Sequence, residues 1–243
     1  MHLVFSKAED TLSGRITLKD KGQVHHLRDV LRLQTGDTLV ACNDKGDKYF
    51  CKISQISQDK IILEIKEKYA VKKKESLVTI ACAIPKKSRM DDIVDKLTQL
   101  GIDMVIPLKT ERTIVKLDRH GEDTKIRRWN KVALSAAEQS KRVTVPIIEE
   151  IKSIEEVLRD SAGFDLKLIP TLSGQRKKLK EILGERKAKN ILFFIGPEGD
   201  FTEKEVLLAQ SYGCIPVTLG ETVLRVETAA VAVASFIEMY ENG

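Results

Sequence analysis

The sequence predicts an α/β protein with two domains, a small N-terminal β-barrel (residues 1–70) and a larger domain with a largely parallel sheet (residues 76–243). In the first part of the chain, hydrophobic residues occur mainly in short β-branched or aromatic runs, which are typical of strands. From about Ser76, such runs alternate with longer amphipathic segments, the pattern of a parallel sheet covered by helices. A lysine-rich run over residues 67–75 is expected to join the two domains.

In the first domain, a helix is expected over residues 23–33, because Val24, Leu27, Val30 and Leu31 recur at helical spacing. The turn over residues 44–47 contains Gly46 and predicts a hairpin. Short strands around one helix indicate a small, partly closed barrel. The expected strands are residues 15–18, 38–42, 49–53 and 60–65.

In the second domain, Gly101 is expected to end a helix, and Thr202 with Glu205 forms a capping box that begins another. The strands carry continuous apolar runs, as strands buried on both faces do. The expected strands are residues 77–83, 104–107, 166–170, 190–195 and 215–219, and the expected helices are residues 88–100, 125–139, 202–212 and 227–240.

Composition narrows the class of protein. No stretch approaches the roughly 20 apolar residues of a membrane span, and the N-terminus lacks a secretory pattern, so a cytoplasmic protein without a membrane partner is expected. The four cysteines, Cys42, Cys51, Cys82 and Cys214, show neither disulfide nor metal-binding spacing, so no metal is expected. A net charge of +5 favours a polyanionic partner.

Three loops follow predicted strands and are candidates for a ligand site, since ligands of such sheets bind beyond the carboxyl ends of the strands. The loops cover residues 170–174, 196–201 and 219–230. Gly196, Gly199 and Gly220 permit close approach of a ligand or unusual φ values. The alternative is that the Gly-Pro-Glu-Gly run is only a tight turn before a capped helix.

Charged residues flank the entry to the final helix. Arg225 could stabilise negative charge that develops on a substrate, and Glu227 could accept hydrogen bonds near the positive end of the helix. The alternative for the same two residues is a surface salt bridge with N-terminal capping.

Stretches spread along the whole chain resemble the RsmE family of SPOUT methyltransferases. Two departures from the family pattern stand out: Asp200 occupies a position where the family usually has a second glycine, and Val226 replaces a common threonine. The stretches that carry the resemblance are residues 25–33 with 36–37, residues 96–101 with Pro107 and 111–112, residues 137–142 with Pro146, residues 195–199, and residues 219–220 with 224–225 and 227–229.

The resemblance implies methylation of N3 of a uridine in 16S ribosomal RNA of the small subunit, with S-adenosylmethionine as the methyl donor. It also implies a C-terminal trefoil knot, a homodimer packed through the knotted domains, and a PUA-like barrel that binds RNA through His25, Arg28 and Arg32. The cofactor-binding residues that it implies are Thr171, Leu172, Ser173, Gly196, Pro197, Glu198, Gly199, Leu219, Gly220, Val223, Leu224, Thr228 and Ala229.

For catalysis, Arg225 is expected to stabilise the uracil anion that forms when N3 loses its proton. Arg112 or Arg142 would hold the flipped nucleotide or its phosphate. Glu138 or Glu227 would orient these arginines or take the proton, and the sequence does not choose between them. The remaining alternatives are a methyltransferase acting on transfer RNA or another base, and a non-catalytic RNA-binding protein of the same fold.

Overall fold

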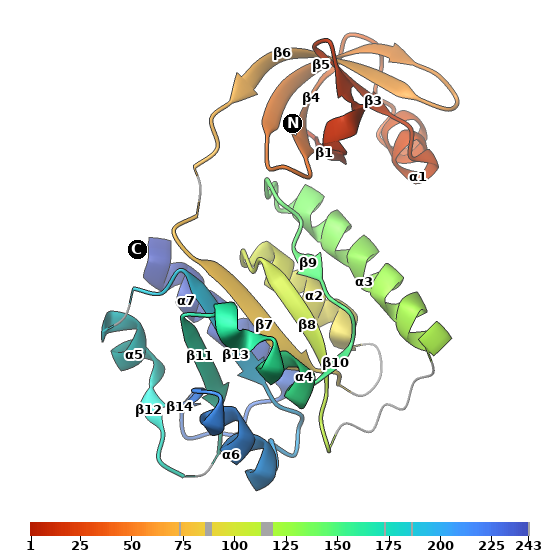
Figure 1. Ribbon diagram of the computed structural model, residues 1–243. Helices are drawn as coiled ribbons and strands as arrows, with labels where there is room; N and C mark the ends of the chain where they lie inside the picture. Colours follow the sequence, from red (N-terminus) through yellow and green to blue (C-terminus); the bar gives the residue numbers. More distant parts are fainter. Residues whose placement is uncertain (73, 86–88, 113–118, 173, 186, 243) are drawn as a thin grey trace. The chain divides into compact units, whose positions relative to one another are not determined.

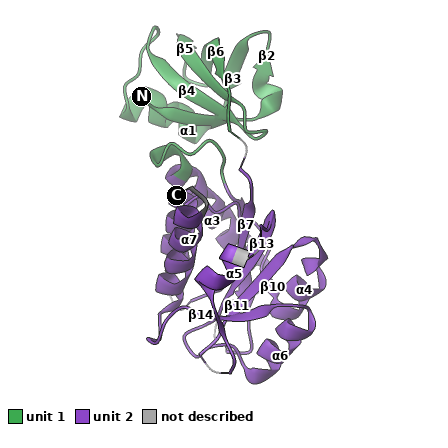
Figure 2. Cartoon of the chain, turned by 90° about the vertical axis from the view of Figure 1, so that its left-hand side faces the viewer, with its two compact units in different colours: residues 1–73, 137–145 green, residues 74–136, 146–243 purple. Residues whose placement is uncertain are grey.

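The computed structural model describes residues 1–72, 74–85, 89–112, 119–172, 174–185 and 187–242. The chain divides into two compact units (Figure 2). Residues 1–73 and 137–145 form the first unit, and residues 74–136 and 146–243 form the second. The segment 137–145 therefore clusters with the N-terminal unit, which the sequence-based division between residues 70 and 76 did not anticipate.

The first unit contains a six-stranded sheet in the order β1-β4-β5-β6-β3-β2. Strand β1 pairs with β4 in parallel, and the other pairings are antiparallel. The sheet is curled, because β1 and β3 contact each other although three strands separate them in this order. The strands are β1 (Leu3–Ser6), β2 (Thr11–Leu12), β3 (Arg15–Leu18), β4 (Thr38–Asn43), β5 (Lys48–Ile56) and β6 (Ile61–Tyr69), with a short 3₁₀ helix at Ala8–Asp10.

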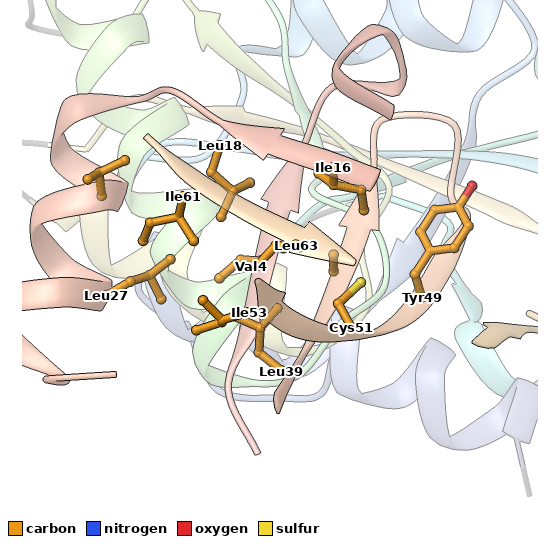
Figure 3. Close-up of a cluster of buried hydrophobic side chains, with 12 residues drawn as sticks. Val4, Ile16, Leu18, Leu27, Leu39, Tyr49, Cys51, Ile53, Ile61 and Leu63 are labelled. Carbon is orange, nitrogen blue, oxygen red and sulfur yellow. The ribbon is translucent and has the colours of Figure 1, made fainter. Parts of the chain in front are cut away.

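The core of the first unit lies inside this curled sheet (Figure 3). In β5, Cys51 and Ile53 are buried while Lys52 between them is exposed, which is the alternation expected of a strand with one solvated face. Leu27 of the helical segment is also buried in this cluster. The four expected strands and the hairpin are confirmed, and Gly46 takes the positive φ (+81°) that its turn requires.

The helical segment of the first unit is shorter than predicted. Asp20 caps α1 (Lys21–His25) by accepting a hydrogen bond from the Gln23 N–H at 2.9 Å. The chain then widens into a π-helical turn (His26–Val30), and Arg32 has a left-handed φ of +53°. Arg28 and Arg32 are consequently not on one helical face, because the helix ends at Val30 rather than at residue 33.

The second unit contains an eight-stranded sheet in the order β10-β8-β7-β13-β11-β14-β12, with β9 paired to β8. Every pairing among its described strands is parallel, so the carboxyl ends of these strands lie at one edge. The strands are β7 (Leu77–Ala83), β8 (Met104–Lys109), β9 (Ile147–Ile148), β10 (Lys152–Ser153), β11 (Leu166–Pro170), β12 (Lys177–Lys178), β13 (Asn190–Ile195) and β14 (Ile215–Thr218).

Helices cover both faces of this sheet, with α2 and α7 on one face and α4 and α6 on the other (Figure 1). Double coverage explains the continuous apolar run of β13, in which Phe193 and Phe194 point to opposite faces and both are fully buried. The helices are α2 (Arg89–Gln99), α3 (Arg119–Gln139), α4 (Ile154–Arg159), α5 (Leu179–Glu185), α6 (Glu203–Ser211) and α7 (Val226–Asn242), with a 3₁₀ helix at Ser161–Gly163. No helix in the described ranges has the length and apolar character needed to cross a membrane.

Two predicted helix boundaries are confirmed by their hydrogen bonds. Gly101 (φ +83°) ends α2 in a Schellman motif, with the Ile102 N–H donating to the Leu97 carbonyl at 3.0 Å. Thr202 and Glu205 form the predicted capping box of α6. The expected start of α2 at Ser88 lies outside the described residues.

The short elements β1, β2, β9, β10, β12, α4 and α5 were not predicted from the sequence. Strands of two residues carry no readable alternation, so a periodicity argument cannot find them. The start of α4 did carry a signal, because Ser153 and Glu156 form a capping box of the same kind as the one recognised at Thr202.

Candidate functional site

The three loops singled out in the sequence meet at the carboxyl edge of the second unit's sheet. Strand β11 lies between β13 and β14, so the loops that follow these three strands emerge side by side. Together with the first residues of α7 they line a pocket of about 550 Å³, counting the part open to solvent.

The pocket combines an apolar lining with negative charge. Its apolar side chains include Leu172, Ile195 and Leu219, and its two carboxylates are Glu198 and Asp200. Such a lining suits a ligand that joins an apolar ring to a positively charged group. The remaining lining residues are Pro170, Thr171, Gly196, Pro197, Gly220, Thr222, Val223, Leu224, Val226 and Ala229.

Most of the predicted cofactor-binding residues lie in this lining. Gly199 and Thr228 are not among the lining residues, and Ser173 lies outside the described residues. Five further residues line the pocket. Pro170, Asp200, Thr222 and Val226 belong to the three candidate loops but were not named individually as cofactor-binding, and Ile195 lies just before the second loop. Four of these five residues have apolar or uncharged side chains, and they adjoin predicted residues in the chain. Their position in the sequence was therefore the signal that could have identified them as pocket residues.

The three glycines of these loops serve different purposes. Gly220 has a φ of +126°, and a side chain at this position would project into open space. A Cβ at Gly196 would lie 3.0 Å from the Phe201 ring, and one at Gly199 would lie 3.3 Å from Cδ of Arg112. Contacts within the protein therefore limit the space for a side chain at Gly196 and, less strictly, at Gly199, where Arg112 would have to shift. Of the three glycines, only Gly220 has the unusual φ that was expected.

Arg112 forms hydrogen bonds to the second loop, residues 196–201. Its Nη1 donates hydrogen bonds to the carbonyl oxygens of Gly199 and, at 3.4 Å, Asp200. The side chain thus comes from the loop after β8 to a loop that borders the pocket. Its predicted role in holding a nucleotide stays a prediction.

Glu227 forms an ion pair with Arg89, a partner that the sequence did not indicate. Nη1 of Arg89 lies 3.3 Å from Oε1 of Glu227 and 3.9 Å from Oε1 of Glu198. Arg89 begins α2, after the carboxyl end of the central strand β7, and this position was the signal that could have identified it. Oε2 of Glu227 is buried and has no hydrogen-bond partner among the described residues. Burial and the neighbouring Glu227 carboxylate raise the pKa of Cys82.

The guanidinium of Arg225 is exposed at the start of α7, and its backbone carbonyl accepts the first helical hydrogen bond, from the Ala229 N–H at 2.8 Å. In the described part of the chain, no carboxylate pairs with this side chain. The alternative of an ordinary salt bridge applies to Glu227, which pairs with Arg89, rather than to Arg225.

Glu138 and Arg142 belong to the first unit and are not among the residues that line the pocket of the second. The Glu138 carboxylate accepts hydrogen bonds from the Gln23 side chain and the Phe5 backbone, and burial raises its pKa. The Arg142 N–H donates to the Ala137 carbonyl at 2.9 Å and helps to end α3. Their catalytic roles stay predictions.

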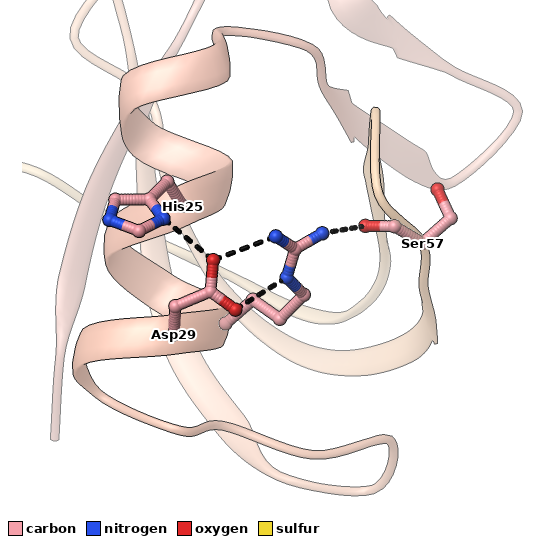
Figure 4. Close-up of polar contacts among 4 residues, drawn as sticks. His25, Asp29 and Ser57 are labelled. Atoms are coloured by element: carbon pink, nitrogen blue, oxygen red, sulfur yellow. Dashed lines mark hydrogen bonds and ion pairs between the residues drawn. The ribbon is translucent and has the colours of Figure 1, made fainter.

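The three predicted RNA-binding residues include two members of a polar cluster on the first unit (Figure 4). Asp29 accepts hydrogen bonds from Nε and Nη2 of Arg28, each at 2.7 Å, and its Oδ2 lies 2.6 Å from Nδ1 of His25. The hydrogen bond from Arg28, followed by that from His25, lowers the pKa of Asp29 to about 2. This bidentate pair fixes the guanidinium plane of Arg28, which also reaches the Ser57 carbonyl at 3.4 Å.

No cluster of three or more histidine, cysteine, aspartate or glutamate side chains suited to a metal ion occurs among the described residues. The second unit is thus defined as an α/β domain with a small-molecule pocket at the carboxyl edge of a parallel sheet, and the first as a curled β-sheet that displays arginines. The RNA methyltransferase domain family matches residues 72–238, and the RNA methyltransferase PUA domain family matches residues 18–66. The chain belongs to the RsmE family of RNA methyltransferases.

Relatives match over nearly the whole chain. Ribosomal RNA small subunit methyltransferase E of Bacillus subtilis (strain 168) is 32% identical over 88% of this chain and 86% of its own length. The enzyme of the same name from Rickettsia conorii is 29% identical over 93% of this chain and 91% of its own length. The crystal structure of ribosomal RNA small subunit methyltransferase E from Neisseria gonorrhoeae bound to S-adenosyl methionine superimposes with a TM-score of 0.87, at 28% identity, covering 99% of this chain and 98% of that chain.

Proposed function

We propose that this protein transfers a methyl group from S-adenosylmethionine to N3 of a uridine in 16S ribosomal RNA. The observation that carries the proposal is the pocket formed by the three loops, in a chain that belongs to a family of RNA methyltransferases. The second unit would bind the cofactor and carry out the transfer, and the first unit would bind RNA. The protein would act in the cytoplasm, where ribosomal subunits are assembled.

The lining fits this cofactor chemically. The apolar side chains of Leu172, Leu219 and Leu224 suit the faces of an adenine ring, and the carboxylate of Glu198 suits a positive charge of the cofactor. When bound, S-adenosylmethionine supplies a methyl group that is already activated for displacement. The protein therefore has to bind, orient and protect the reactants rather than create a reactive group.

Arg225 would stabilise the uracil anion. Loss of the N3 proton spreads negative charge onto O2 and O4 of the ring. Arg225 is exposed and lies in the chain between the pocket-lining residues Leu224 and Val226, and its guanidinium would donate hydrogen bonds to either oxygen. Arg112 or Arg142 would hold the flipped nucleotide or its phosphate. Glu227 and Glu138 remain the two candidates for the base. Glu227 has a buried oxygen without a hydrogen-bond partner among the described residues, and its other oxygen pairs with Arg89.

Two measurements test the proposal. Calorimetric titration of the purified protein with S-adenosylmethionine should show binding, and no binding would leave the alternative of an RNA-binding protein without catalysis. Mass spectrometry of ribosomal RNA from cells lacking the protein should show one unmethylated uridine in 16S RNA, restored by the wild-type chain. A modification lost from transfer RNA instead would identify the other alternative substrate.

We also propose that the second unit contains a trefoil knot and that the protein forms a homodimer. The chain reaches β14 only after forming β13, yet β14 pairs with β11 on the side away from β13. This order supports the trefoil knot that the family resemblance implies, in which the last segment is threaded past the preceding loops. A homodimer packed through the knotted domains would follow the same resemblance, and sedimentation equilibrium would measure it.

For the RNA-binding surface, replacing Arg28 and Arg32 by glutamine should weaken RNA binding and flatten its dependence on salt. Each lost phosphate contact should lower the slope of log affinity against log salt by about 0.7–0.9. Glutamine is preferable to glutamate at position 28, because a second carboxylate would face Asp29. Filter binding to a 16S RNA fragment across a salt series measures the slope.

The matched control is the double variant Lys177→Gln and Lys178→Gln. It also removes two positive charges, but from the exposed strand β12 of the second unit. An unaltered slope in the Arg28 and Arg32 variant would place the RNA-binding surface elsewhere. An equal change in both variants would indicate attraction by net charge alone.

A further inference from the structure

Asp200 adopts a backbone conformation that few residues accept. Its φ is +64°, in the left-handed region where residues with a Cβ are strained and where aspartate and asparagine are among the least disfavoured. Four non-glycine residues have a positive φ among those described: Ser13, Arg32, Lys141 and Asp200. Of these, Asp200 alone lines the pocket.

The Asp200 side chain connects two of the three loops. Its Oδ2 accepts a hydrogen bond from the Leu172 N–H at 2.9 Å, across a separation of 28 residues in the chain. Its Oδ1 accepts one from the N–H of the adjacent Phe201, also at 2.9 Å. Both carboxylate oxygens are therefore directed at backbone N–H groups, and the charge makes these hydrogen bonds stronger than neutral ones.

The position of Asp200 depends on its own loop. The Asp200 N–H donates to the Pro197 carbonyl at 2.9 Å and closes a turn over residues 197–200. Arg112 holds the carbonyls of Gly199 and Asp200 from the other side. With the backbone fixed at both points, the left-handed φ aims the carboxylate at the neighbouring loop.

The loop that Asp200 reaches is anchored at Thr171, the residue before Leu172. The Thr171 N–H donates to the Val217 carbonyl at 3.1 Å, and Nη1 of Arg176 donates to the Thr171 carbonyl at 3.1 Å. Leu172, the next residue, is 48% exposed and lines the pocket. Burial therefore does not fix the position of Leu172. The hydrogen bond from the Leu172 N–H to the charged Asp200 carboxylate holds it instead.

We propose that Asp200 is a positioning residue, which sets the first pocket loop against the second before the ligand binds. The inference rests on the proposed function, because it takes S-adenosylmethionine as the ligand. The carboxylate acts through the Leu172 backbone rather than on the ligand's positive charge, since both of its oxygens already accept hydrogen bonds from N–H groups. Preorganisation of this kind raises affinity by lowering the ordering cost of binding.

Asp200→Gly removes the carboxylate but allows the backbone to keep its conformation, because glycine accepts a φ of +64° without strain. The dissociation constant for S-adenosylmethionine should rise roughly tenfold, the usual effect of losing one charge-assisted hydrogen bond. Turnover at saturating cofactor and RNA should stay within about threefold. Asp200→Asn tolerates the same φ and keeps one acceptor oxygen, so its loss of affinity should be intermediate.

Hydrogen exchange locates the effect within the loop. In Asp200→Gly, exchange at the Leu172 N–H should become faster, while the Thr171 N–H, which is bonded to Val217, should stay protected. Ser13→Gly places a glycine at another exposed left-handed position (φ +50°) in the first unit and should change neither quantity. Unchanged affinity in Asp200→Gly, with or without faster exchange at Leu172, would overturn the proposal.

A comparison of two ligands distinguishes positioning from direct charge contact. S-adenosylhomocysteine lacks the positive sulfonium but retains the rest of the cofactor. Positioning predicts that Asp200→Gly weakens both ligands by the same factor, whereas a larger loss for S-adenosylmethionine would show direct contact and overturn the proposal. If the wild-type protein bound neither ligand, the proposed function itself would fail, and the exchange at Leu172 would still report the loop contact.

Discussion

Replacing Arg225 by alanine is expected to lower turnover roughly a hundred- to a thousandfold, or about 3–4 kcal/mol in activation free energy. The loss should occur in the chemical step, because the guanidinium is expected to act on the charge that develops as the uracil N3 loses its proton. Single-turnover methylation of a 16S RNA fragment at saturating cofactor measures it. The dissociation constant for S-adenosylmethionine should change much less, since Arg225 is not among the pocket-lining residues.

The fold should tolerate this change. Arg225 is exposed, and no ion pair involves its side chain in the described ranges, so removing it leaves no buried charge without a partner. Arg225→Lys is the matched control, because it keeps the charge but offers a point donor instead of a planar fork, and it should recover part of the rate. Turnover within about threefold of wild type in the alanine variant would mean that another group stabilises the anion.

Gly220→Val is expected to weaken S-adenosylmethionine binding by at least about a hundredfold while leaving the protein folded. Gly220 lines the pocket with a φ of +126°, which a β-branched residue adopts only with strain on the order of 1–3 kcal/mol. Relief of that strain would move the loop and break the contacts between Gly220 and the Thr218 hydroxyl (3.0 and 3.2 Å). Calorimetric titration measures the affinity, and circular dichroism checks the fold.

Gly14→Val provides the control for strain alone. Gly14 also has a positive φ (+75°) with nothing within 4 Å of an added Cβ, but it lies in the first unit. Gly14→Val should lower the free energy of unfolding by about as much as Gly220→Val does. It should not change the affinity for S-adenosylmethionine. Full affinity in Gly220→Val would show that the third loop does not form part of the cofactor site.

The sequence by itself determined the five longer strands of the second unit's sheet and the loops that line its pocket. Residues 190–195 form a continuous apolar run, which only a strand covered on both faces can bury, and the loop after it contains Gly196 and Gly199. Because parallel strands end at one edge, the loops after β11, β13 and β14 had to lie on the same side of the sheet. Local periodicity and strand direction were sufficient for these conclusions.

Only the tertiary structure decided which side chains act together. Arg89 and Glu227 are far apart in the sequence, as are Leu172 and Asp200, and no local pattern relates them. The same holds for Gly199, whose small size accommodates Arg112 rather than the pocket, and for Arg28, which Asp29 holds in place. Local periodicity depends on neighbouring residues and is therefore readable from a sequence, whereas a contact between loops depends on backbone geometry that forms only when the chain has folded.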